Sequence, residues 1–98
     1  MAGAKVQVQF AAAAVGGRDS APICGPYRPH LRVRDGEYLG VEFVGERGAH
    51  VPAGVVTQAQ VQFIYPGVSY EPLKPGVQFT VLEGPLVVGV GAVEELLP

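Results

Sequence analysis

The sequence predicts an all-β fold, a six-stranded antiparallel closed β-barrel formed by a single domain over residues 1–98. Short stretches alternate between apolar and polar residues with a period of two, which is typical of half-buried strands. The 14 glycines and 9 prolines gather between these stretches, where turns are expected. Because the stretches are rich in valine, an open sheet would expose apolar edges, and closure into a barrel removes them.

The predicted strands are bounded by turn residues. They occupy residues 5–10, 27–34, 38–43, 55–66, 77–84 and 86–96. In the first strand Val6, Val8 and Phe10 share one face, and lysine and glutamine occupy the other. In the fourth, the outward positions are again glutamines, so valine and phenylalanine are expected to fill the interior.

Loops are predicted where the alternation breaks. They cover residues 15–22, 46–54 and 67–76, and a turn at Asp35-Gly36 joins the second and third strands. In the last strand Gly89 and Gly91 lie two residues apart and share a face, which predicts a bend or close backbone packing at a barrel corner. Residues 92–98 also permit a helical turn, but a strand fits the barrel better.

The second strand carries the most distinctive pattern of the chain. Arg28, His30, Arg32 and Arg34 occupy alternate positions, and we call these four residues the arginine strip. Their side chains are expected about 6.5 to 7 Å apart on one face, a spacing that suits phosphates or the carboxylates of an acidic partner. Alternatively, acids of a neighbouring strand, such as Glu42 or Glu46, pair with them as ordinary cross-strand partners.

No arrangement of residues predicts catalysis, and we expect a protein that is not an enzyme, without cofactor or metal. His30 and His50 lie far apart in the chain with no flanking ligands. Glu94 and Glu95 are neighbours in a strand and are therefore expected on opposite faces. The single cysteine, Cys24, has no predicted base beside it and reads as a small buried hydrophobic residue.

Composition and charge narrow the classes of function and the cell compartments that fit this chain. The net charge of −2 argues against a dedicated nucleic-acid-binding protein. No apolar run approaches the length of a membrane span, and the N-terminus lacks the pattern of a signal peptide. A lone cysteine suits a reducing compartment. We therefore expect a cytoplasmic protein with no membrane association.

The stretch GGRDSAPICGPYRPHLRVR, residues 16–34, resembles the start of the C-terminal β-barrel domain of elongation factor Tu. That family has a Gly-Gly-Arg turn and then Gly-Tyr-Arg-Pro before an alternating strand. The residues here that match are Gly16, Gly17, Arg18, Pro22, Tyr27, Arg28 and Pro29. Further along, the family's glycine-rich frame is matched by Gly76, Phe79, Glu83, Gly84, Gly89, Gly91 and Val93.

The resemblance spans residues 5–97 and implies the same barrel, as a free-standing relative. In elongation factors this barrel packs against the GTPase domain, holds the acceptor and T stem of aminoacyl-tRNA and meets the exchange factor. The resemblance also implies that a set of residues orders the loop and the domain contact. That set is Gly16, Gly17, Arg18, Tyr27, Arg28 and Pro29.

Two departures from the family bear on function. The basic turn after Glu-Gly is replaced by Pro85-Leu86-Val87, and the turn after the second strand is shortened to Asp35-Gly36-Glu37. Both changes remove groups that meet phosphate and ribose. We therefore expect a non-enzymatic binding module for a protein partner linked to translation, a translation GTPase or its regulator. The alternative is an RNA-binding module that holds tRNA through the arginine strip. The oligomeric state stays open.

Overall fold

The computed structural model describes residues 2–11, 20–22, 27–45 and 50–98. These residues form strands and no helix, so they contain no helix able to cross a membrane. The strands are β1 (Gly3–Phe10), β2 (Ser20–Pro22), β3 (His30–Arg32), β4 (Leu39–Val44), β5 (His50–Pro52), β6 (Thr57–Phe63), β7 (Gln78–Glu83) and β8 (Leu86–Leu97).

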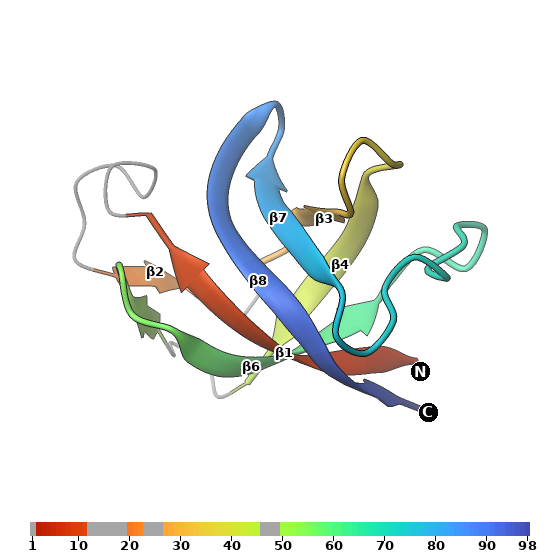
Figure 1. Ribbon diagram of the computed structural model, residues 1–98, viewed down its shortest axis with the longest axis horizontal. Helices are drawn as coiled ribbons and strands as arrows, with labels where there is room; N and C mark the ends of the chain where they lie inside the picture. Colours follow the sequence, from red (N-terminus) through yellow and green to blue (C-terminus); the bar gives the residue numbers. More distant parts are fainter. Residues whose placement is uncertain (1, 12–19, 23–26, 46–49) are drawn as a thin grey trace.

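Six of these strands close into an antiparallel barrel in the order β1-β6-β4-β3-β7-β8, which confirms the predicted fold class. β1 and β8, at the two ends of the chain, pair with each other and complete the circle. Figure 1 shows β8 curving strongly across the barrel from its turn with β7 to the two neighbouring chain ends.

The two remaining strands differ from the prediction. β2 and β5 lie in segments predicted as loops, yet they pair antiparallel in a small two-stranded sheet, with Ala21 opposite Val51. Each has only three residues, too few to show a recognisable alternation. The connection between β6 and β7 contains no strand, as predicted. Gly16, Gly17, Arg18 and Cys24 lie outside the described residues.

The interior is apolar, and the described residues include no buried polar or charged side chain. The largest of its fully buried side chains are Phe10, Phe43, Leu31, Leu39, Leu73, Val6, Val8, Val41, Val61, Val81 and Val88. At one end of the core the ring of Tyr27 packs between those of Phe10 and Phe43, with ring centres 6.0 and 5.4 Å away. The predicted inward face of the first strand is confirmed, and so is that of the fourth strand within β6. Val55, which was expected on the same face, lies before β6 and is half exposed.

The glycines of β8 lie where the barrel wall is tightest. A Cβ atom on Gly89 would lie 2.7 Å from the carbonyl oxygen of Gln9, and one on Gly91 would lie 2.7 Å from the ring of Phe79. Both distances are shorter than real Cβ contacts, so β1 and β7 approach β8 this closely only because these positions lack side chains. The predicted close backbone packing is confirmed.

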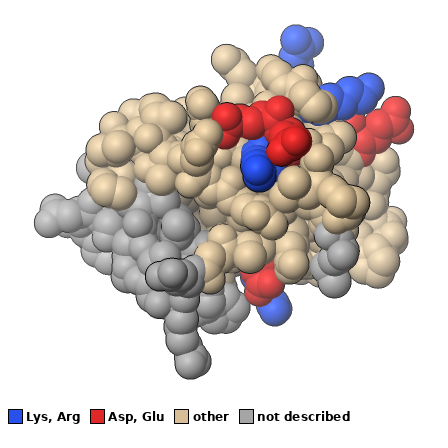
Figure 2. All heavy atoms as spheres, turned by 90° about the horizontal axis from the view of Figure 1, so that it is seen from below, with Lys and Arg blue, Asp and Glu red and all other residues tan. Residues whose placement is uncertain are grey.

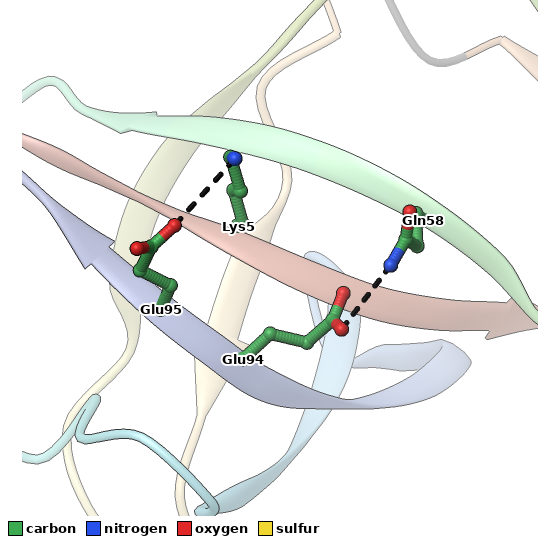
Figure 3. Close-up of polar contacts among 4 residues, drawn as sticks. All are labelled: Lys5, Gln58, Glu94 and Glu95. Carbon is green, nitrogen blue, oxygen red and sulfur yellow. Dashed lines mark hydrogen bonds and ion pairs between the residues drawn. The ribbon is translucent and has the colours of Figure 1, made fainter.

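The end of β8 corrects one prediction. The pairing with β1 shifts between Lys5 and Val6, so that Lys5 lies opposite Glu95 and Val6 opposite Val93. Glu94 is the extra residue of a β-bulge, which interrupts the alternation of side chains. Glu94 and Glu95 are therefore not on opposite faces; both are exposed on the outer face (Figure 3).

Candidate binding surface

The arginine strip lies on the hairpin of β3 and β4, and its first cation is paired. His30 lies opposite Gly40 in this hairpin, and the same register continues beyond β3, since Val41 N–H donates to the Pro29 carbonyl. That register places Arg28 opposite Glu42, whose Oε1 accepts a hydrogen bond from the Arg28 Nε at 3.0 Å. The cross-strand alternative considered above is what the structure shows for this arginine.

Arg32 is held by its neighbours and keeps part of its guanidinium free. Its Nε donates to the Gly36 carbonyl at 2.8 Å, and its guanidinium lies over the Tyr38 ring, 5.2 Å from the ring centre. The His30 ring packs against the same tyrosine, with 5.7 Å between the ring centres. These contacts fix the direction of Arg32 and leave its two terminal nitrogens without a partner among the described residues.

Arg34 departs from the strand. Its φ of 54° lies in the left-handed region, and the Gly36 N–H donates to the Val33 carbonyl to close a tight turn around it. Within the described ranges its side chain makes no hydrogen bond or ion pair. The four residues of the strip therefore differ in their contacts. Arg28 is paired with an acid, Arg32 is held by a carbonyl and a ring, the His30 ring packs at a tilt against a tyrosine, and Arg34 has no polar partner in the described part of the chain.

The described residues that the resemblance assigned to a loop and domain contact serve the barrel itself. Pro29 is buried, and its carbonyl accepts the Val41 N–H. Tyr27 packs in the aromatic cluster, and its hydroxyl donates to Glu83 Oε2 at 2.7 Å. Sequence reasoning did not foresee the Tyr27–Glu83 contact, because the two residues are 56 positions apart.

Apolar side chains are exposed along the first half of β8. We call Leu86, Val87, Val90 and Ala92 the β8 stripe; the first three are 54, 50 and 51% exposed. Beyond the stripe, the strand becomes polar at the Glu94 bulge. The sequence shows the apolar turn at Pro85-Leu86-Val87 but does not predict that exposed apolar side chains continue through Val90, because an apolar run in a strand does not reveal which residues face outward.

A groove of about 1020 Å³ runs over Val90 and Ala92, the second half of the β8 stripe, and over their neighbours on β1, β7 and β3. Leu86 and Val87 do not line it. Register places Gln9, Val90, Thr80 and Arg32 in one row across these four strands. A second row holds Gln7, Ala92 and Gln78. The groove is thus apolar along its middle, polar on both sides, and cationic at the β3 end, where Arg32 and Arg34 line it.

Charge elsewhere on the surface is sparse and mixed. Lys5 Nζ lies 3.5 Å from Glu95 Oε2, and the Gln58 side chain donates to Glu94 across β1 at 3.2 Å (Figure 3). On the face seen in Figure 2, basic and acidic side chains lie next to one another within a mainly uncharged surface. The described residues on that face offer no continuous basic track for a phosphate backbone.

Within the described ranges, no three His, Cys, Asp or Glu residues gather closely enough to hold a metal ion. No family model matches the chain. No curated protein matches it.

Proposed function

We propose that this chain is a non-enzymatic binding module that docks a protein partner on its outer surface. The observation that carries the proposal is the β8 stripe, a run of exposed apolar side chains in which Val90 and Ala92 have polar residues on both neighbouring strands. Apolar centres with polar rims are the usual anatomy of protein–protein contact surfaces. Burying the exposed half of each valine or leucine would contribute about 1 kcal/mol to binding.

The packed interior supports a role in binding more than one in catalysis. The described core contains no polar or charged side chain that could serve as an acid, base or nucleophile within the barrel. On the outer surface, the side chains that line the groove are those of glutamine, threonine, valine, alanine, arginine and one phenylalanine. These are groups that recognise a partner through hydrogen bonds and apolar contact.

We further propose that the chain is related to the C-terminal barrel of elongation factor Tu, with a translation GTPase or its regulator as partner. The support is the Gly-Gly-Arg and Tyr-Arg-Pro residues quoted above, together with the closed six-stranded barrel. Barrels of this class occur in unrelated proteins, so the relationship rests on those residues.

RNA binding through the arginine strip is the competing proposal. It needs several free cations in a row, whereas Arg28 is paired with Glu42 and Arg32 is tied to Gly36 and Tyr38. Among the described residues, Arg34 makes no hydrogen bond or ion pair, and Arg32 keeps only its two terminal nitrogens available. A strip in this state offers fewer phosphate contacts than its sequence suggests.

Affinity purification tests the proposal. The immobilised chain is exposed to lysate of its source cells with and without ribonuclease, and a protein is expected to be retained in both. Val87→Asp should abolish retention, because a buried charge in an apolar contact is costly. Val55→Asp is the matched control, since Val55 is equally exposed, at 50%, but lies outside the stripe and the groove. Recovery of RNA alone, or of proteins lost on ribonuclease treatment, would overturn the proposal in favour of RNA.

A further inference from the structure

The groove over Val90 and Ala92 has one chemically distinct end. Arg32 and Arg34 line it at β3, while the other described cations, Lys5, Arg28 and Lys74, do not line it. Asp35 and Glu37 lie on the same turn, but neither makes an ion pair with Arg34 among the described residues. Positive charge is therefore concentrated at one end of an otherwise neutral groove.

The sides of the groove present unused hydrogen-bonding groups. Gln7 and Gln78 flank Ala92 in one row, and within the described part of the chain neither amide makes a hydrogen bond. Each amide offers two donors and an acceptor, which match the alternating N–H and C=O groups of an extended polypeptide. In the neighbouring row Gln9 is already committed, since its Nε2 donates to the Gly54 carbonyl at 3.1 Å.

We propose that this groove binds an extended acidic segment of the partner protein, with a carboxylate held by Arg32 and Arg34 and a small apolar side chain over Val90. The inference rests on the proposed function and names the site and the partner's chemistry. Four strands span about 14 Å at the usual separation of about 4.8 Å, the length of four or five extended residues. Arginine forks bind carboxylates in a bidentate manner.

A nucleic-acid strand suits the groove less well than a peptide does. Bases stack on exposed aromatic rings, and the one aromatic residue that lines the groove, Phe79, is 3% exposed. A strand of several nucleotides also presents a phosphate at every step, whereas the cations here stand at one end only. The pattern of one charged end and a neutral middle fits a segment with a single terminal acid.

Fluorescence anisotropy with synthetic peptides tests the inference on the whole chain. The probe is a pool of labelled pentapeptides with glutamate at one end and alanine, valine, serine or threonine elsewhere, and a second pool carries glutamine in place of glutamate. Saturable binding of the glutamate pool alone is expected, and it should weaken as salt rises. Arg34→Gln should lower the affinity at least tenfold, the effect of losing a charge-assisted hydrogen bond.

Lys74→Gln is the matched control, because it removes the same charge from an exposed residue outside the groove and should leave binding unchanged. Equal binding of the two pools, no binding of either, or an Arg34→Gln variant that binds as the parent does would each overturn the inference. So would an oligouridine probe that competes with the glutamate pool and binds more tightly.

The two proposals fail in different ways. If the parent and Arg34→Gln retain the same ribonuclease-resistant protein, the proposal of a protein-binding module is supported and the proposal of an acidic peptide in the groove is wrong. If the glutamate pool binds in an Arg34-dependent manner but no protein is retained from lysate, the groove does bind acidic peptides and the proposal of a cellular protein partner is wrong.

Discussion

Gly91 shows how a single residue sets the thickness of the barrel wall. A Cβ atom there would collide with the Gln7 carbonyl oxygen of β1 and lie 2.7 Å from the Phe79 ring of β7. Neither neighbour has room to retreat, because one is backbone and the other is a ring packed in the core. The glycine thus allows β8 to contact both strands at once.

Gly91→Ala should lower the free energy of unfolding by about 1–3 kcal/mol, the usual cost of overpacking a tight site. Urea denaturation followed by circular dichroism measures it. Gly67→Ala is the control: no atom lies within 4 Å of its Cβ position, so stability should be unchanged or slightly raised. Equal stability of the two variants would show that the wall is more compliant than the packing implies.

At the scale of elements, the long connection between β6 and β7 is pinned to the barrel by one tyrosine. The Tyr70 hydroxyl donates to the Gly40 carbonyl at 2.5 Å and accepts the Tyr65 N–H at 3.2 Å. Its ring stacks on Phe63, with ring centres 4.3 Å apart. A connection without strands thereby acquires a fixed position on β4 and β6.

Tyr70→Phe should destabilise the protein by about 1–2 kcal/mol, because two hydrogen-bonding groups lose their partner while the stacked ring remains. Thermal unfolding measures the change. Tyr65→Phe is the matched control, since the Tyr65 hydroxyl makes no hydrogen bond among the described residues. A Tyr65→Phe variant that loses as much as Tyr70→Phe would contradict this account.

The strand β8 also shows why alternation is an incomplete guide to which face a residue occupies. The pattern placed Gly89 and Gly91 correctly on one face, and it failed at Glu94, where an extra residue shifts the pairing with β1. A bulge depends on how two strands meet, and the sequence of one strand does not contain that information. The left-handed turn at Arg34 interrupts the arginine strip for a similar reason.

For the molecule as a whole, the barrel and its core could be predicted because alternation and turn residues are local signals. For Val6, Val8 and Phe10, the alternation within a single strand is enough to predict that they face the core. The groove could not be predicted in this way. It depends on Gln7, Ala92 and Gln78 becoming neighbours, and that requires β1 and β8 to pair across nearly the whole chain.

The topology predicts where the fold opens last. β1 is paired on both sides along most of its length, with β6 and with β8, whereas β2 and β5 share three residue pairs. In hydrogen exchange, the amides of β1 should therefore be protected most strongly, and those of β5 at least tenfold less. Exchange of β1 as fast as that of β5 would mean that the barrel is not the cooperative unit.

The pairing of Gly3 with Leu97 brings the two chain ends side by side, as Figure 1 shows. A linker of a few residues could therefore join them, and new ends could be cut between β6 and β7. Such a circular permutant would keep every pairing between strands of the barrel, but the strands would follow one another in a different order along the sequence.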